Sequence, residues 1–353
     1  MPIPRSPRRA AALLASCATL VLACGDGAAD PAADAVTTPS QSATAAEVAT
    51  AGGRYDEPYK ISLAQWSLHK RYLPPGVMGG TGAGDPYDFP ADAKALGFDG
   101  VEYVSALYGA DIEEGAEHGK SVTEVLSKLD ARAKAAGVEE VLIMVDGEGE
   151  LADLDDAERE RAVERHKHWI DGAWASGIPT IRVNAGGESL RAVAARQTAH
   201  DQAVKSLRAL GEYAAPRNVN VVVENHGGFS SDPAWLAGVM AAVGLPNVGI
   251  LPDFGNFCRR RVNPTVWEEG CADEVPADSI YAAVGMWMPY AHAVSAKSYA
   301  FDADGNETAI DYARMLDTVR AHGYDGYVGV EFEGGELTEE EGIAATKALL
   351  ERH

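Results

Sequence analysis

The eight residues VVVENHGG at positions 221–228 join an apolar, β-branched run to a carboxylate, an amide, an imidazole and two glycines. The same order returns in LPDFGN at 251–256 and in VGVEFEG at 328–334, where an acid again follows apolar residues directly. Polar side chains at the ends of buried strands are typical of α/β proteins, whose functional groups gather at the carboxyl ends of parallel strands. These three stretches therefore predict an α/β fold with a site at one end of its sheet.

Short β-rich runs and segments with a 3.6-residue apolar repeat alternate along the chain. The predicted strands are 61–66, 100–104, 140–145, 180–184, 219–224, 248–251, 291–296 and 327–331. The predicted helices are 122–136, 157–176, 203–214, 233–243, 312–322 and 338–350. Eight strand–helix units predict a single (β/α)8 TIM barrel over residues 54–353, and a doubly wound open sheet is the alternative.

The N-terminal segment has the order of a secretory signal. Residues 1–10 hold three arginines and no acid, and residues 10–23 form a short apolar run that ends in small residues. The four residues VLAC at 21–24 resemble a bacterial lipobox, which implies cleavage after residue 23 and a lipid on the sulfur of Cys24. The alternative is an ordinary signal peptide with an incidental cysteine. We expect an exported lipoprotein, anchored on the periplasmic or cell-surface side only through its lipid.

Residues 24–53 are rich in Ala, Ser, Thr, Pro and Asp and contain almost no large apolar side chain. Such a composition predicts a flexible tether between the lipidated cysteine and the barrel. Two further cysteines, Cys258 and Cys271, lie close together in the sequence, and export makes them a candidate disulfide. Two unpaired thiols are the alternative.

The formal net charge of −23 bears on the class of partner. Nucleic-acid binding depends largely on Lys and Arg contacts to phosphates, so this charge argues against a nucleic-acid partner. The acidic excess does not by itself identify a partner, since it is also a common route to solubility, and it does not determine the oligomeric state.

Three acids occupy equivalent strand ends, namely Glu224, Asp253 and Glu331. Like charges at a crowded barrel mouth destabilise one another unless cations neutralise them. A divalent metal such as Mn, Mg, Zn or Co would do so. The alternative is a set of salt bridges, for which Arg182 and Lys297 are the candidates.

Several segments together resemble the xylose-isomerase-like sugar isomerase/epimerase superfamily. They are SLAQWSLHK at 62–70, LGFDGVEYVS at 96–105, IRVNAGG at 181–187, ENHGG at 224–228, PDFGNF at 252–257, AHAVSAKSY at 291–299 and YVGVEFEG at 327–334. The resemblance covers residues 58–350, and it implies a TIM barrel with a metal held by Glu224, Asp253, a histidine of the seventh strand and Glu331.

The chain departs from the family pattern at that histidine. The family has it two residues before a lysine, whereas here Ser295 stands two residues before Lys297. The nearest imidazole in the strand is His292, which an odd offset places on the opposite strand face, so it is the weaker ligand candidate. Water or His226 could complete the set instead.

The resemblance implies a metal-dependent sugar isomerase or epimerase that works through an enediolate. Glu224 and Glu331 would form the proton-transfer pair. The predicted substrate-binding residues are His69, Arg182, His226, Asn256 and Lys297. Export favours a free sugar or a sugar derivative over a sugar phosphate. The alternatives are a lyase that performs β-elimination on 3-keto-glycosides and a sugar-binding lipoprotein without catalytic activity.

Overall fold

The computed structural model describes residues 59–186, 194–263 and 270–353. The predicted signal peptide, the lipidation residue Cys24 and the tether lie outside these ranges, and they stay predictions. Residues from Arg54 to His353 form one compact unit. No helix in the described part of the chain has the length and apolar character needed to cross a membrane.

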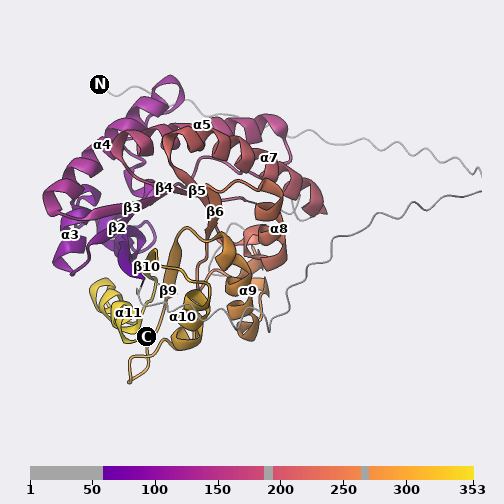
Figure 1. Ribbon diagram of the computed structural model, residues 1–353. Coiled ribbons are helices and arrows are strands. Elements are labelled where there is room, and N and C mark those ends of the chain that lie inside the picture. Colours follow the sequence, from indigo (N-terminus) through magenta and orange to yellow (C-terminus); the bar gives the residue numbers. More distant parts are fainter. Residues whose placement is uncertain (1–58, 187–193, 264–269) are drawn as a thin grey trace, which may run out of the picture. The chain divides into compact units, whose positions relative to one another are not determined.

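Eight parallel strands form the centre of this unit (Figure 1). They are β1 (Lys60–Ala64), β2 (Gly100–Val104), β3 (Glu139–Met144), β4 (Thr180–Val183), β5 (Asn220–Glu224), β6 (Val248–Leu251), β9 (Val294–Ser298) and β10 (Tyr327–Phe332). Their order is β6-β5-β4-β3-β2-β1-β10-β9. Parallel bridges from Ile250 to Ala291 and from Asp253 to Ser295 then join the two outer strands. The ring is thereby closed, and the predicted TIM barrel is confirmed.

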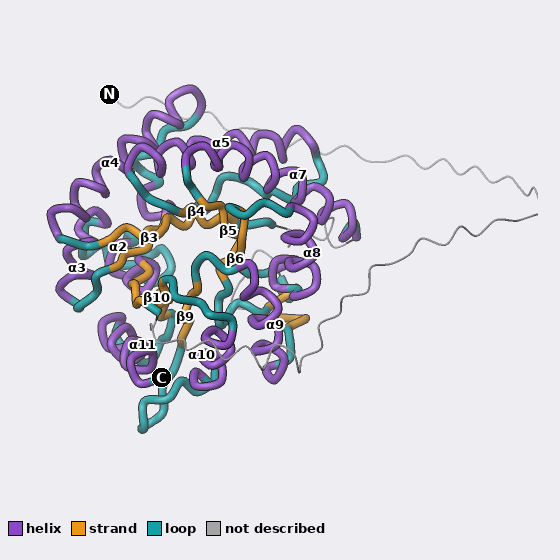
Figure 2. Tube along the Cα trace, viewed as in Figure 1, coloured by secondary structure: helices purple, strands orange, loops and turns teal. Residues whose placement is uncertain are grey.

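Helices surround the strands, as the tube view shows (Figure 2). They are α2 (His69–Tyr72), α3 (Phe89–Ala95), α4 (His118–Ala136), α5 (Asp156–Ser176), α7 (Arg196–Ala214), α8 (Pro233–Val243), α9 (Ile280–Trp287), α10 (Tyr312–Ala321) and α11 (Glu339–Arg352). All six predicted helices are present. Helices α2, α3 and α9 were not predicted. The sequence of α9, IYAAVGMW, is apolar on every side and shows no amphipathic period.

Helix starts follow the capping signals of the sequence. The side chain of Asp232 accepts a hydrogen bond from the backbone N–H of Trp235 at the start of α8. Thr338 and Glu341 form a reciprocal capping box at the start of α11. These caps fix where the chain leaves β5 and β10 and enters the next helix, so they also fix the loops that carry the site.

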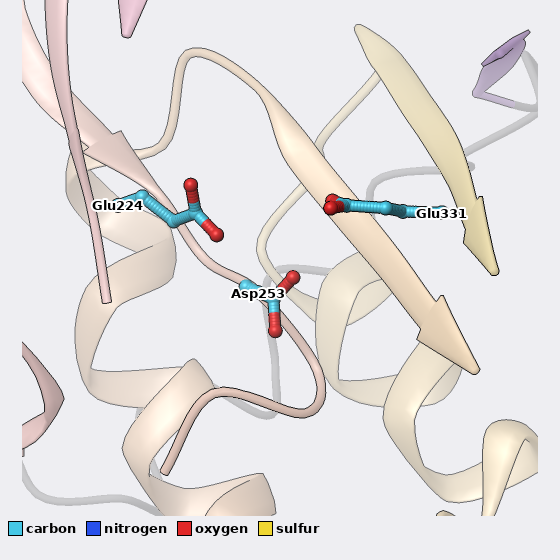
Figure 3. Close-up of side chains that lie close together, drawn as sticks. All are labelled: Glu224, Asp253 and Glu331. Carbon is cyan, nitrogen blue, oxygen red and sulfur yellow. The ribbon is translucent and has the colours of Figure 1, made fainter. Parts of the chain in front are cut away.

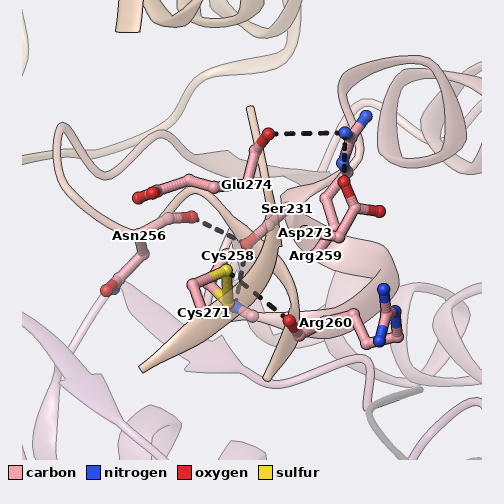
Figure 4. Close-up of a disulfide and its surroundings, with 9 residues drawn as sticks. Ser231, Asn256, Cys258, Arg259, Arg260, Cys271, Asp273 and Glu274 are labelled. Carbon is pink, nitrogen blue, oxygen red and sulfur yellow. Dashed lines mark hydrogen bonds and ion pairs between the residues drawn. A yellow bond between two sulfur atoms is a disulfide. The ribbon is translucent and has the colours of Figure 1, made fainter. Parts of the chain in front are cut away.

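A two-stranded antiparallel hairpin follows β6 and was not predicted. It consists of β7 (Cys258–Arg261) and β8 (Cys271–Glu274). A disulfide joins the candidate pair Cys258 and Cys271, whose Cα atoms are 5.7 Å apart (Figure 4). Asn256 lies two residues before this cross-link, so the hairpin restrains the loop that leads from β6 into the barrel mouth.

The barrel has a small apolar cluster inside the ring and a larger core between strands and helices. The inner cluster consists of Ala64, Val104, Val141, Leu142, Met144, Val222, Leu251 and Ala293. Alternate residues of a strand point to opposite faces, so the same strands send their remaining apolar side chains outward under the helices. Because all strands are parallel, their carboxyl ends meet at one mouth, where the polar residues lie.

Candidate metal and substrate site

Three buried carboxylates converge at the barrel mouth (Figure 3). Glu224 ends β5, Asp253 comes two residues after β6, and Glu331 lies near the end of β10. One oxygen from each lies within 4.8 Å of the others, so the three could hold a metal ion. This is the group that the sequence predicted from three equivalent strand ends. Carboxylate oxygens suit hard divalent cations such as Mn or Mg.

Asp253 and Glu224 are oriented by the loop that follows β6. The backbone N–H groups of Gly255 and Asn256 each donate to Asp253 Oδ1 at 2.8 Å. The Asn256 side chain donates to Glu224 Oε1 at 2.9 Å. Asn256, which the sequence suggested as a substrate ligand, therefore orients the carboxylate pair.

Glu224 retains one oxygen with spare bonding capacity. Its Oε2 atom lies 2.6 Å from Arg182 Nε, yet the two atoms are not aligned as a hydrogen bond. No described residue donates a hydrogen bond to this buried oxygen. A buried acceptor without a donor is costly, and a bound cation would satisfy it. The donor set of this structure thus fits a divalent metal.

Ser295 occupies the position between the other two acids. Its hydroxyl lies 2.8 Å from Asp253 Oδ2 and 2.8 Å from Glu331 Oε2. A hydroxyl has one proton, so it can donate to only one of these oxygens at a time. The hydroxyl therefore bridges Asp253 and Glu331 while it satisfies one of their two oxygens at a time.

His292 is not a member of this cluster, and the structure does not support it as a weak ligand. A Cβ atom at Gly249 would lie 2.1 Å from His292 Cδ2, which places the imidazole beside the start of β6. Asp253 is four residues farther along that segment. The histidine therefore lies toward the opposite end of the barrel, because each strand residue advances by about 3.3 Å.

Two buried cations partly neutralise the acids. Lys297 Nζ lies 2.8 Å from Glu331 Oε1, 3.3 Å from Glu333 Oε2 and 3.8 Å from Asp253 Oδ2. Arg182 contacts Asp146 at 2.7 Å as well as Glu224. The salt bridges that the sequence offered as the alternative to a metal are thus present. They do not balance the site, because five acids (Asp146, Glu224, Asp253, Glu331 and Glu333) face two cations.

Burial and charge together set the proton affinities. Burial raises the pKa of Glu224 to about 7, although Arg182 opposes the shift. Burial likewise raises the pKa of Asp253 to about 7, against the effect of Lys297. Burial and the neighbouring Arg182 lower the pKa of His226. At neutral pH the carboxyl groups can therefore both accept and release protons, while the imidazole is neutral.

A cleft of about 540 Å³ adjoins the cluster, and Glu331 is the one of the three carboxylates that lines it. Its lining comprises Trp66, His69, Lys70, Met78, Val104, Ala106, Met144, Asp146, Arg182, His226, Glu331 and Glu333. Among the predicted substrate-binding residues, His69, Arg182 and His226 line the cleft. Lys297 and Asn256 do not line it. Lys297 donates a hydrogen bond to Glu331, and Asn256 donates one to Glu224.

Trp66 and Glu333 also line the cleft, and neither was among the predicted site residues. The indole N–H of Trp66 donates to Glu333 Oε1, and the indole ring stacks on His69 with centroids 4.6 Å apart. A signal for Glu333 existed, since it follows Glu331 by two residues at the end of the same strand. Nothing in the pattern around Trp66 distinguishes it from a core tryptophan.

The comparisons with known proteins agree with this geometry. The family described as xylose isomerase-like TIM barrel matches residues 90–353. A search of the curated proteins found no match. Among solved structures, the fold is similar to 3-keto-D-glucoside 4-epimerase from E. coli, with a TM-score of 0.59 and 16% identity over 84% of this chain and 100% of that one.

Two further structures share the fold. L-ribulose 3-epimerase has a TM-score of 0.57 and 14% identity over 83% of this chain and 94% of that one. D-psicose 3-epimerase from Clostridium cellulolyticum has a TM-score of 0.59 and 12% identity over 83% of this chain and 98% of that one. The family match spans most of the sequence, and the barrel ends in a buried Glu–Asp–Glu cluster. The chain belongs to the xylose isomerase-like TIM barrel family.

Proposed function

We propose that the protein is a metal-dependent isomerase or epimerase of a free sugar or sugar derivative, acting by proton transfer through an enediolate. The observation that carries this proposal is the convergence of Glu224, Asp253 and Glu331 beside an open cleft. A structural salt-bridge network alone does not require an adjoining cleft. The family match and the fold shared with sugar epimerases support the same chemistry.

Glu224, Asp253 and Glu331 would hold the metal. When bound, a divalent ion polarises a carbonyl oxygen and the neighbouring hydroxyl oxygen of a sugar. The chain's own contribution is to orient these carboxylates, through Asn256 on one side and Ser295 with Lys297 on the other.

Proton transfer would use the two glutamates. One carboxylate removes the proton from the carbon next to the carbonyl, and the C–H electron pair moves into the enediolate. The other carboxyl group returns a proton to the opposite face or to the adjacent carbon, so the substrate keeps its composition. Glu224 and Glu331 come from β5 and β10, which are separated in the ring, so they can approach a bound sugar from different sides.

A second candidate is β-elimination from a 3-keto-glycoside, which begins with the same proton abstraction. It gains support from the fold shared with a 3-keto-D-glucoside 4-epimerase. A sugar-binding lipoprotein without activity is less well supported. Such a protein has no need for a proton-transfer pair such as Glu224 and Glu331.

The location outside the cytoplasm is part of the proposal. The basic and apolar segments of residues 1–23, followed by Cys24, support export and lipid attachment. Mass spectrometry of the N-terminal peptide from membranes of expressing cells would identify a lipidated Cys24. A Cys24→Ser variant recovered in the soluble fraction would agree with the anchor, and an unmodified wild-type peptide would exclude it.

The decisive experiment measures metal and proton exchange together. The purified protein and its Glu224→Gln/Glu331→Gln variant are analysed for metal content, after reconstitution with Mn, Mg, Zn or Co. Each is then incubated in D₂O with free ketoses and 3-keto-glucosides, and NMR follows deuterium at the exchangeable carbon. We expect stoichiometric metal and exchange in the parent and neither in the variant. Absence of metal after every reconstitution would exclude the proposed mechanism.

A further inference from the structure

The lining of the cleft falls into two unlike groups of side chains. The polar and charged group, here called its charged side, comprises His69, Lys70, Asp146, Arg182, His226, Glu331 and Glu333. The apolar group, here called its apolar side, comprises Trp66, Met78, Val104, Ala106 and Met144. Proton transfer on a single sugar ring involves only the charged side. The apolar side presents apolar surface to an open cleft, which costs free energy unless a ligand covers it.

The chain between β1 and α3 holds part of this surface in a fixed position. Backbone hydrogen bonds run from Thr81 to Lys70 at 2.7 Å, from Gly82 to Leu73 at 2.8 Å and from Gly80 to Val77 at 2.7 Å. Space is tight, because a Cβ atom at Gly80 would lie 2.4 Å from the carbonyl oxygen of Leu73. The loop is therefore tied to α2 in one shape.

That shape places Met78 at the rim. Its side chain is 64% exposed, and its φ is +44°, in the left-handed region that L-residues seldom adopt. Both the exposure of a large apolar side chain and the strained backbone work against folding stability. Strain of this kind tends to gather at ligand-binding sites, where the surrounding contacts hold it in place.

Trp66 is fixed on the same side. The hydrogen bond from its indole to Glu333 and its stacking on His69 restrict the ring. One face of the indole meets His69, so a ligand ring can meet the remaining surface. Aromatic rings bind both aromatic groups and the apolar faces of sugar rings, and a fixed ring loses little entropy on binding.

From these observations we infer that the apolar side is a second subsite, which binds the ring attached to the reacting sugar of a glycoside. The inference rests on the proposed function, in that the charged side is taken to bind the reacting sugar. The volume of about 540 Å³ agrees with a two-ring ligand, since sites for drug-sized ligands measure about 300–1,000 Å³. The attached ring is either an aromatic aglycone or a second sugar.

Calorimetric titration of the full chain with three probes tests the subsite. Methyl β-D-glucoside carries no second ring, phenyl β-D-glucoside carries an aromatic ring, and cellobiose carries a second sugar. Met78→Asn removes the apolar side chain at a position where asparagine tolerates the backbone, and Trp66→Leu removes the aromatic ring. Met286→Gln, at a 47% exposed methionine of α9 outside the cleft, is the matched control.

We expect the wild type to bind at least one two-ring probe roughly tenfold tighter than the methyl glucoside. Met78→Asn and Trp66→Leu should remove most of this preference, and Met286→Gln should keep it. Preference for the phenyl glucoside alone identifies an aromatic aglycone, and preference for cellobiose alone identifies a second sugar.

Equal affinity for all three probes, absence of binding, or an unchanged preference in both cleft variants would overturn the subsite. Failure of the proposed reaction is a separate result. Deuterium exchange into free ketoses does not involve the second ring, so exchange without a two-ring preference leaves the reaction standing and removes only the subsite.

Discussion

The two sides of the barrel mouth are built from the same kind of strand and end in opposite chemistry. On β4, β5, β6, β9 and β10, the strand ends and the loop after β6 carry Arg182, Glu224, Asp253, Ser295, Lys297 and Glu331. The strands β1, β2 and β3 contribute Ala64, Val104, Leu142 and Met144 to the apolar inner cluster, to which Val222 of β5 and Leu251 of β6 also belong. All eight strands belong to one parallel sheet. The difference between the charged and the apolar parts of the mouth therefore comes from the side chains and not from the backbone.

Glu102 is a buried acid of β2, and its surroundings differ from those of the acids at the site. Ser62 donates to its Oε1 at 2.5 Å, and its Oε2 has no hydrogen-bond partner in the described ranges. Burial raises its pKa to about 8, so it is mostly protonated at neutral pH. Glu224 and Asp253 are equally buried, but Arg182 and Lys297 keep their pKa values near 7. Arg182 and Lys297 thus offset part of the effect that burial has on Glu224 and Asp253.

The largest expected effect comes from matched substitutions on the two sides. Glu331→Gln removes a member of the proton-transfer pair, so deuterium exchange into the substrate should slow by about 10²–10⁴-fold. Val104→Thr, on the apolar side, should change the rate by less than about tenfold, because it alters contact but no reacting group. NMR-detected exchange measures both. Comparable losses in the two variants would contradict the division of roles.

Removal of the buried ammonium group tests the balance of charge. Lys297→Met leaves Glu331, Glu333 and Asp253 without their nearest cation, so the free energy of unfolding of the metal-free protein should fall by about 3–5 kcal/mol. Added Mn²⁺ should restore part of the loss, because it supplies the missing positive charge. Urea denaturation with and without Mn²⁺ measures this.

A surface pair provides the control for that experiment. Lys134 is 74% exposed and lies 2.7 Å from Asp130, so Lys134→Met should lower the free energy of unfolding by less than about 1 kcal/mol, with no effect of Mn²⁺. A Lys297→Met variant that resembles this control would show that water reaches the site and screens its charges.

The barrel was predictable because β-rich runs alternate with segments that have a 3.6-residue apolar repeat. All eight strands lie within two or three residues of their predicted positions, since β-branched runs between amphipathic helices have few other arrangements. The sequence did not reveal the short helices α2 and α3, helix α9 or the β7–β8 hairpin. Helix α9 is apolar on all sides, and the arginine-rich β7 lacks strand alternation.

The positions of the site residues along the chain were predictable, but their side-chain contacts were not. Strand ends located Glu224, Asp253 and Glu331, because parallel strands share one mouth. Whether Asn256 and Lys297 face a ligand or a carboxylate depends on side-chain directions in loops, which no spacing rule supplies. Ser295 illustrates the same limit, since its two contacts depend on β6 and β10 together.

The pH dependence of stability should separate Glu102 from the networked acids. Its pKa is raised from 4.5 to about 8 by burial, so the folded state binds a proton that the unfolded state releases between these values. Its stabilising effect is therefore complete below pH 4.5 and is lost as pH rises through about 8. Relative to Glu102→Gln, the wild type should lose roughly 2–4 kcal/mol between pH 5 and pH 9. Parallel denaturation profiles for the two proteins would exclude a protonated Glu102.

The smallest expected effect concerns Ser295, which joins the acids of β6 and β10. Ser295→Ala removes one hydroxyl and both of its contacts, so the metal-free protein should lose about 1–2 kcal/mol of stability. The loss should shrink when Mn²⁺ is bound, because a cation then holds Asp253 and Glu331 together in place of the hydroxyl. Thermal unfolding at several Mn²⁺ concentrations gives both the stability and the metal affinity. If affinity for Mn²⁺ falls by more than about tenfold in the variant, the hydroxyl contributes to metal binding through the orientation of the carboxylates or as a ligand. If affinity is unchanged, Ser295 only positions the two carboxylates, and the charged side of the mouth binds its cation through carboxylates alone.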